Sequence, residues 1–221
     1  MNTTTDDHLD LLVQRVRALS AAASHRIVVG ISGSPGAGKT TLARSLVDRL
    51  GEDAAHLPMD GFHLANRTLD SLGSRGRKGA VDTFDGWGFV ALLGRVRAET
   101  TNPVYAPSFE RSVDEPIAGE IAIAPHIGIV ITEGNYLLVP EAPWSAARAL
   151  MDEAWFCATD DAERQRRLVD RHTLFGRARE EAISWARDVD GANAVLIEST
   201  RDSADLVVSG ITGEILSSAA R

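Results

Sequence analysis

The feature that most constrains this chain is a glycine-rich stretch at residues 33–41, which reads GSPGAGKTT. It fits the pattern G-x-x-x-x-G-K-[ST], which binds phosphate when it joins a strand to a helix. The apolar, β-branched run 27–31 precedes it, as expected of a buried parallel strand. Apolar residues follow at helical spacing up to Leu50, and Gly51 stands where a helix cap belongs. The sequence therefore predicts a strand, a phosphate-binding loop and a helix, in that order.

The residue types in this stretch suit a triphosphate. Glycines allow backbone conformations that a Cβ would block, so successive N–H groups can turn towards phosphate oxygens. The helix N-terminus adds a partial positive charge at the same point. Lys39 would contact the β- and γ-phosphates, and the Thr40 hydroxyl would bind Mg²⁺. We expect MgATP to be bound by the whole stretch, which comprises Gly33, Ser34, Pro35, Gly36, Ala37, Gly38, Lys39, Thr40 and Thr41.

Composition excludes several other classes of protein. The net charge of −8 disfavours a nucleic-acid partner, because phosphate backbones attract basic surfaces. The single cysteine, Cys157, lies in an apolar run and is expected to be an inert core thiol. No apolar stretch approaches the length of a transmembrane helix, and the N-terminus lacks the pattern of a signal peptide. We therefore expect one domain over residues 1–221, in the cytoplasm and without a membrane partner.

The rest of the chain alternates between strands and helices. An amphipathic helix is expected at 6–22 and another near 86–99. Further strands are expected at 54–60, at 127–133, around Cys157 and at 205–208. This order predicts an α/β fold with a mainly parallel sheet, whose ligands bind beyond the carboxyl ends of the strands. The long segment 61–126 exceeds a plain crossover, so we expect it to form an acceptor-binding insertion.

Two acidic residues are expected at this edge of the sheet. Asp60 would end the second strand, where its carboxylate could accept a proton from an acceptor hydroxyl during phosphoryl transfer. The alternative is a strand-terminal aspartate that only caps the next turn. Glu133, at the end of the third strand, resembles a Walker B carboxylate that binds Mg²⁺ directly or through water. It too could simply be a turn residue.

Residues 160–180 are rich in arginine: between 163 and 179 there are six, against one glutamate and one aspartate. Arg167 and Arg171 are four residues apart and would share a helical face. Guanidinium groups suit the oxygens of a transferring phosphoryl group, so we interpret the segment as a lid over the nucleotide. The alternative is a solvated helix with paired charges, which we favour for Arg164 and Arg166 taken singly.

The chain resembles a known group of enzymes over residues 25 to 209. The similarity lies in GSPGAGKTT, PMDGFH, RKGAVDTFD, VYAPSFERSVDEP, VITEGNYLL, the arginine-rich segment and SADLVV, in that order. These motifs resemble the phosphoribulokinase/uridine kinase family of P-loop kinases. Within that family the chain is most similar to type I pantothenate kinases and to small bacterial proteins associated with fructose transport.

The resemblance implies an ATP-dependent kinase that phosphorylates an alcohol group, with five parallel strands in the order 2-3-1-4-5. It assigns Asp60 as the base, Lys39 and Thr40 to phosphate and Mg²⁺, and Glu133 to the metal. It places Arg167 and Arg171 in the lid. The three residues on segments that shape the acceptor pocket are His63, Tyr105 and Arg111. His63 could instead be a hydrogen-bonded loop residue, and Arg111 could pair with Glu110 or Asp114.

The sequence indicates the identity of the acceptor less directly than it indicates a kinase. The chain is shorter than a typical pantothenate kinase, and uridine kinases lack the DGFH motif followed by Asn66. Asp190, Asn193 and Ala194 follow the lid as in the sugar-kinase-like members. A sugar or polyol is our first choice, with pantothenate and nucleosides as alternatives and a homodimer left open. A GTPase would need an N-K-x-D motif, which the sequence lacks. The D-x-x-G pattern, which also occurs in GTPases, is present at 85–88 and 188–191, but neither match stands at the end of an apolar strand, so we treat both as chance. A nucleotide sensor without catalysis is the other alternative.

Overall fold

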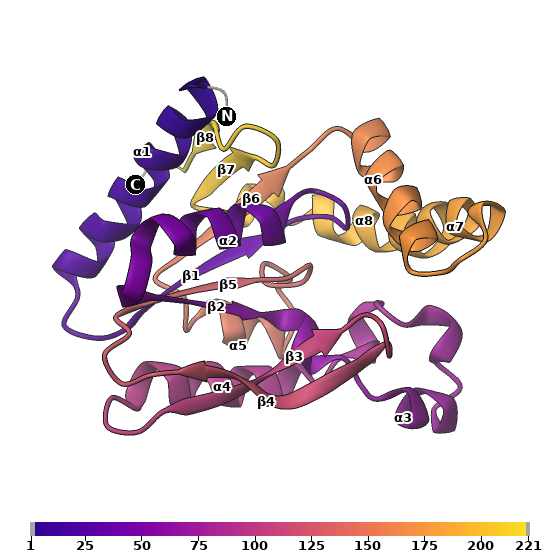
Figure 1. Ribbon diagram of the computed structural model, residues 1–221, viewed down its shortest axis with the longest axis horizontal. Coiled ribbons are helices and arrows are strands. Elements are labelled where there is room, and N and C mark those ends of the chain that lie inside the picture. Colours follow the sequence, from indigo (N-terminus) through magenta and orange to yellow (C-terminus); the bar gives the residue numbers. More distant parts are fainter. Residues whose placement is uncertain (1–2, 220–221) are drawn as a thin grey trace.

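The computed structural model of the protein describes residues 3–219 and is built around a six-stranded sheet (Figure 1). Its strands are β1 (Ile27–Ser32), β2 (Ala54–Pro58), β5 (Ile129–Glu133), β6 (Glu153–Ala158), β7 (Leu206–Ser209) and β8 (Ile215–Ser218). The order is β2-β5-β1-β6-β7-β8. The first five are parallel and β8 is antiparallel to β7. The expected order 2-3-1-4-5 is confirmed, and β8 is an addition at the edge.

Alternating side chains of β1 bury opposite faces of the sheet, as a strand period of two requires. Ile27, Val29 and Ile31 belong to a core that also contains residues of α1 (Thr3–Ala22) and α2 (Lys39–Leu50). Val28 belongs to the core on the other face, formed with α4 (Gly86–Ala98) and α5 (Trp144–Arg148). Helices therefore cover both faces, as in other parallel sheets.

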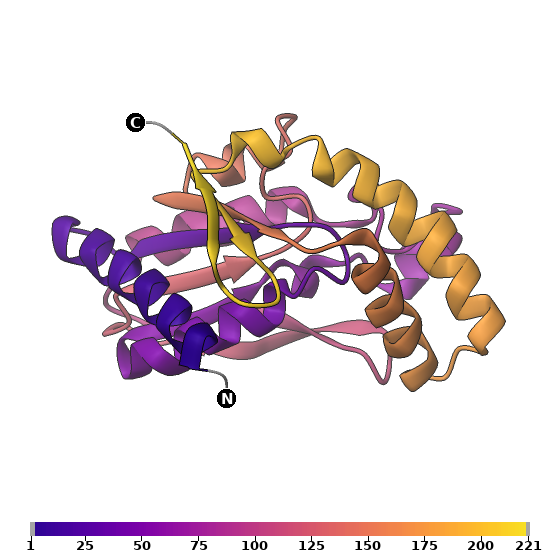
Figure 2. The ribbon, with the colours of Figure 1, turned by 90° about the horizontal axis from the view of Figure 1, so that it is seen from above.

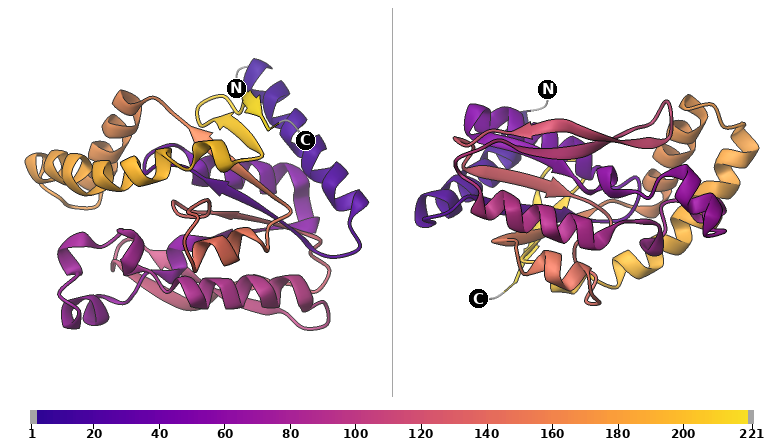
Figure 3. Two further views of the ribbon diagram at one scale, coloured as in Figure 1. Left: turned by 180° about the vertical axis from the view of Figure 1, so that it is seen from behind. Right: turned by 90° about the horizontal axis from the view of Figure 1, so that it is seen from below.

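The segment between β2 and β5 contains more structure than the sequence indicated. It begins with the 3₁₀ turn Met59–Phe62 and the short helix α3 (Asn66–Ser71). After α4 it forms an antiparallel hairpin of β3 (Val104–Glu110) and β4 (Glu115–Ile123). Figure 3 shows this hairpin and α4 together on one side of the sheet. The hairpin was not predicted, because most side chains of β4 are exposed and its pairing shifts register near Pro107.

The arginine-rich segment forms α6 (Asp161–Leu174), followed by α7 (Arg179–Trp185), a π-helical turn at Ala186–Asp190 and α8 (Gly191–Glu198). Figure 2 shows α7, the π-helical turn and α8 as one long rod beyond the carboxyl ends of the strands. Two short 3₁₀ turns, Arg75–Arg77 and Val81–Thr83, follow α3. Within residues 3–219, no helix is both long and apolar enough to cross a membrane.

Candidate active site

The loop between β1 and α2 has the conformation that its glycines were expected to provide. Gly36 and Gly38 have φ angles of 79° and 102°, in the region that disfavours residues with a Cβ. A Cβ on Gly38 would lie 2.5 Å from the Gly210 carbonyl oxygen. Gly38 also precedes α2 without a side-chain cap, so the first N–H groups of α2 remain available for phosphate oxygens.

Lys39 begins α2 and is 92% buried, with its ammonium donating a hydrogen bond to the Ser34 carbonyl oxygen at 3.1 Å. Burial lowers the pKa of this ammonium, and the nearby Glu133 carboxylate offsets part of that effect. An ammonium with so little solvent gains more from a triphosphate than an exposed one would. The placement suits the expected contact between Lys39 and phosphate.

The loop is held from behind by three polar contacts. Arg164 donates to the Pro35 carbonyl oxygen at 3.1 Å, and the Ser34 hydroxyl donates to Glu198 at 2.6 Å. The Thr159 hydroxyl donates to the Ala37 carbonyl oxygen at 2.7 Å. Arg164 pairs with Asp161, as the paired-charge alternative expected, but the solvated part of that interpretation is wrong: Arg164 is 95% buried because α6 packs this face against the loop. Arg166, in contrast, is exposed and pairs with Glu163 and Asp170, as expected.

Gly210, just after β7, leaves no room for a side chain. A Cβ there would lie 1.8 Å from the Ala37 carbonyl oxygen and 2.5 Å from the Thr159 hydroxyl. We expect Gly210→Ala to displace the phosphate-binding loop and weaken MgATP binding at least about tenfold. Isothermal titration calorimetry measures this. Gly94→Ala is the control, because nothing lies within 4 Å of its added Cβ. Unchanged affinity in Gly210→Ala would contradict the tight packing.

The prediction that Cys157 is a core residue is confirmed, since this β6 residue is fully buried behind the same loop. Its Sγ lies 3.4 Å from the Ala37 carbonyl oxygen. Burial raises the pKa of the thiol to about 12, and such a thiol is a poor nucleophile near neutral pH.

Thr40 and Glu133 lie side by side, and the Thr40 hydroxyl donates to the Glu133 carboxylate at 2.9 Å. Two hard oxygen donors next to a phosphate-binding loop fit Mg²⁺, which keeps several waters and takes few protein ligands. The Nε2 atom of His56 lies 3.7 Å from the same carboxylate and is buried without a hydrogen-bond partner among the described residues. A water bound to the metal could satisfy that nitrogen.

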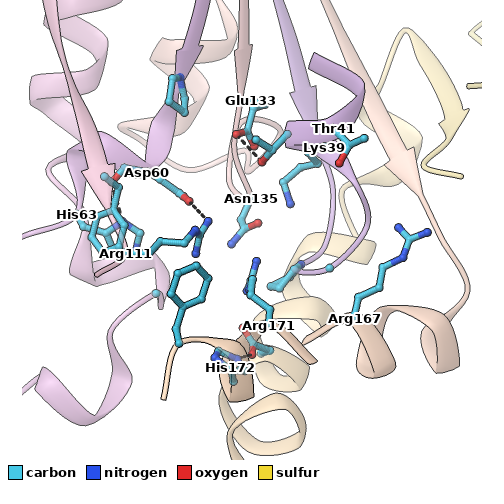
Figure 4. Close-up of a pocket in the computed structure, with 18 of the residues that line it drawn as sticks. Lys39, Thr41, Asp60, His63, Arg111, Glu133, Asn135, Arg167, Arg171 and His172 are labelled. Carbon is cyan, nitrogen blue, oxygen red and sulfur yellow. Dashed lines mark hydrogen bonds and ion pairs between the residues drawn. The ribbon is translucent and has the colours of Figure 1, made fainter. Parts of the chain in front are cut away.

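Asp60 lies in the 3₁₀ turn that follows β2, two residues after the strand ends at Pro58. The expectation that Asp60 itself ends the strand is corrected accordingly. Its carboxylate shares one cleft of about 1140 Å³ with Lys39 and Glu133. Figure 4 shows Asp60 and Lys39 on opposite sides of this cleft. Burial raises the pKa of Asp60, but the charges of His63, Arg111 and Lys39 lower it more, so the carboxyl is ionised near neutral pH.

His63 and Arg111 reach the same cleft as Asp60. His63 Nδ1 lies 2.8 Å from the Asp60 carbonyl oxygen, and its ring packs between Phe84 and Phe109, at 4.0 and 4.6 Å between centroids. Arg111 contacts the Asp60 carboxylate at 3.4 Å, in place of the alternative partners Glu110 and Asp114.

Tyr105 does not reach the cleft. It lies on β3 between the buried residues Val104 and Ala106, so its side chain points to the other face of the hairpin and is 58% exposed. The expectation that Tyr105 helps to shape the acceptor pocket finds no support in this placement.

Arg167 and Arg171 face the cleft from α6, as their spacing predicted. Arg167 donates to Glu163 at 2.7 Å. Arg171 points towards Asn135 and Arg111 in Figure 4. Burial lowers the pKa of the Arg171 guanidinium, and the like charge of Arg111 lowers it further. Two arginines that face each other in this way suit an anionic group between them.

Sequence reasoning missed several residues of the cleft. Asn135 follows β5 and projects between Lys39 and Arg171, although only its position two residues after Glu133 pointed to it. Lys78 donates to the Asn66 side chain at 2.6 Å, and its ammonium lies 4.9 Å from the centre of the Phe109 ring. His172 pairs with Asp190 at 2.8 Å. These contacts join segments distant in sequence, which spacing alone does not reveal.

The D-x-x-G matches have local roles. Asp85 caps α4 by accepting from the Gly88 N–H at 2.8 Å, and Asp188 lies in the π-helical turn. Neither lies among the residues that line the cleft. The two D-x-x-G matches therefore do not support the GTPase alternative.

The fold and the phosphate-binding loop define a P-loop nucleotide-binding protein, and the comparisons with known proteins place it among the kinases. A Schizosaccharomyces pombe protein, provisionally named a uridine kinase, is 33% identical over 194 residues, which cover 83% of each chain. An Aspergillus versicolor protein named as ATP-dependent kinase-like is 42% identical over 125 residues, 53% of this chain and 73% of that one.

Among solved structures, a protein of Silicibacter sp. TM1040, provisionally described as a fructose transport system kinase, superposes with a TM-score of 0.83. It is 37% identical, and the match covers 90% of this chain and 98% of that one. No family model matches the chain. With these relatives, the chain belongs to the phosphoribulokinase/uridine kinase family of P-loop kinases. It is an ATP-dependent kinase.

Proposed function

We propose that the enzyme transfers the γ-phosphate of MgATP to an alcohol group of a small metabolite held against Asp60. The observation that carries this proposal is that Lys39 and the ionised Asp60 carboxylate line one cleft of about 1140 Å³. That volume exceeds what a single drug-sized ligand needs. A nucleotide and an acceptor can therefore occupy it together.

Each polar residue has a part in this reaction. Asp60 accepts the hydroxyl proton as the acceptor oxygen forms its bond to the γ-phosphorus and the bond to the ADP oxygen breaks. Lys39, Arg167 and Arg171 stabilise the charge on the phosphoryl oxygens. Thr40 and Glu133 would hold Mg²⁺, which supplies a positive charge to the β- and γ-phosphates when bound.

Different segments around the cleft bind the acceptor and cover the nucleotide. We propose that residues 61–126 bind the acceptor and that 160–180 act as a lid, within one domain. A sugar or polyol remains our first choice of acceptor, supported by the description of the Silicibacter protein as a fructose transport system kinase. The name of the S. pombe relative keeps nucleosides as an alternative. Pantothenate is the other alternative.

An acceptor screen tests this function. The protein is incubated with MgATP and sugars, polyols, pantothenate, nucleosides or sugar phosphates, and ADP release is followed together with ³¹P NMR of the product. We expect a phosphomonoester to form with at least one acceptor and not with the Lys39→Ala variant. ADP release that no acceptor stimulates, with inorganic phosphate as the sole product, would contradict the proposal.

A further inference from the structure

His56 is a polar residue on a face of the sheet that is apolar around it. It lies on β2 opposite Ile131 of β5, and alternating residues of a strand share a face. Its face is therefore that of Ala54, which belongs to the core formed with α1 and α2. Glu133 lies two residues beyond Ile131, so it projects from the same face. His56 and Glu133 are thus diagonal neighbours on adjacent strands, which places their side chains close together.

One nitrogen of His56 has no partner in the described part of the chain. The Nε2 atom is buried and makes no hydrogen bond within residues 3–219. The Glu133 carboxylate is near, but the distance from Nε2 to Oε1 is 3.7 Å, which is too long for a hydrogen bond. Buried polar atoms in folded proteins are almost always hydrogen-bonded. This nitrogen therefore indicates a group that the site binds from solution.

The Glu133 carboxylate favours a cation at the same point. Its side chain is 5% exposed, and it accepts a hydrogen bond from the uncharged Thr40 hydroxyl at 2.9 Å. A carboxylate removed from water to this extent is stabilised by a nearby positive charge. Because Thr40 donates its hydroxyl proton to Glu133, the lone pairs of the Thr40 oxygen stay free to face a cation. A cation beside these two side chains would suit both.

The partner that suits His56 is a water bound to that cation. His56, Thr40 and Glu133 line one cleft, next to the phosphate-binding loop. Within the residues that the structure describes, no three histidine, cysteine, aspartate or glutamate side chains are grouped so that they could hold a metal. A cation there would therefore be surrounded mostly by phosphate oxygens and waters, as Mg²⁺ is in nucleotide sites. A water bound to a cation donates its hydrogens, and an imidazole nitrogen can accept one of them.

We propose that His56 is a positioning residue for the metal, and that its Nε2 accepts a hydrogen bond from a water bound to the Mg²⁺ of MgATP. This inference rests on the proposed function and adds a residue to the metal site assigned there. His56 orients that water and so helps to hold the cation beside Thr40 and Glu133. Groups that contact a metal through its ligands typically change metal affinity or activity by about 10- to 100-fold.

A purely structural role for His56 makes a different prediction. His56 lies four residues before Asp60, on the strand that leads to it. If the side chain only supported β2, its loss would disturb nucleotide binding whether or not a metal is present. The loss of a contact to a metal-bound water weakens binding when the metal is present. Dependence on the metal therefore separates the two roles.

Calorimetry with a non-hydrolysable ATP analogue, in Mg²⁺ and in EDTA, tests the inference. We expect His56→Phe, which keeps a ring but has no nitrogen, to raise the Kd at least about tenfold in Mg²⁺ and less than about twofold in EDTA. His56→Gln keeps an acceptor oxygen, so its loss of affinity in Mg²⁺ should be smaller. His126→Phe is the matched control, because His126 is exposed and does not line the cleft. Equal losses for His56→Phe with and without the metal, or no loss in Mg²⁺, would overturn the inference.

A direct measurement of metal affinity distinguishes failure of this inference from failure of the proposed function. Mn²⁺ replaces Mg²⁺, and its EPR signal gives the Kd of the metal for the complex of enzyme and analogue. We expect His56→Phe and Thr40→Val each to raise this Kd at least about tenfold. If Thr40→Val does so and His56→Phe does not, His56 has no part in metal binding and the proposed function stands. If neither does, the metal site of the proposed function is contradicted as well.

Discussion

Replacing Asp60 by asparagine is expected to lower kcat by about 10²- to 10⁴-fold, the usual contribution of a positioned general base. Asparagine has nearly the same shape but cannot take the proton of the acceptor hydroxyl. Because Asp60 lies across the cleft from Lys39, the triphosphate contacts should persist. We therefore expect the Kd for MgATP, measured by calorimetry, to stay within about twofold of the wild-type value.

The control for this variant is Asp82→Asn. Asp82 lies on the same long segment, but it is exposed, pairs with Arg77 and does not line the cleft. Its kcat should equal that of the wild type. If Asp60→Asn retained more than about a third of the wild-type kcat, Asp60 would not be the base.

Arg26→Ala is expected to have the largest effect on stability. Arg26 is 96% buried just before β1 and pairs with no carboxylate among the described residues. Instead it donates five hydrogen bonds to backbone carbonyl oxygens, at distances of 2.6 to 3.2 Å. Those carbonyls belong to the end of α4 and to the connection into β5, at Val96, Glu99, Ala124, Pro125 and Ile127.

Alanine at this position would leave several of these carbonyls without partners, and each costs about 1–3 kcal/mol when buried. Water can reach some of them, so we expect a loss of about 3 kcal/mol in the free energy of unfolding and a Tm lower by about 6–12 °C. Urea denaturation and calorimetry measure both. Arg95→Ala, an exposed change on α4, should alter stability by less than about 0.5 kcal/mol. Equal stability of the two variants would contradict this role of Arg26.

Much of the fold could be predicted because the strands of the parallel sheet are buried on both faces. Runs such as 27–31 and 129–131 are apolar throughout, and the glycine loop fixes how the first strand meets its helix. The exposed strands β4 and β8 lack that pattern. Their stability comes from pairing with β3 and β7, which is a tertiary property.

The residues of the candidate site also differ in how well the sequence predicts their positions. Lys39, Thr40, Asp60 and Glu133 follow or begin elements of the sheet core, so their common position could be inferred from topology. The roles of Arg164 and Tyr105 depend on which face of an element packs against its neighbour. Arg164 turns inward to the Pro35 carbonyl, and Tyr105 turns outward from the hairpin. Judged by residue type alone, Arg164 was expected to face solvent and Tyr105 to face the acceptor pocket.

The most direct test of the central claim is a crystal structure of the enzyme with Mg²⁺ and a non-hydrolysable ATP analogue. We predict that residues 33–41 enclose the triphosphate, that Thr40 and Glu133 lie beside the metal, and that the terminal phosphate points at the Asp60 carboxylate, with room for one hydroxyl between them. A terminal phosphate directed away from Asp60, or an Asp60 side chain turned out of the cleft, would contradict the account.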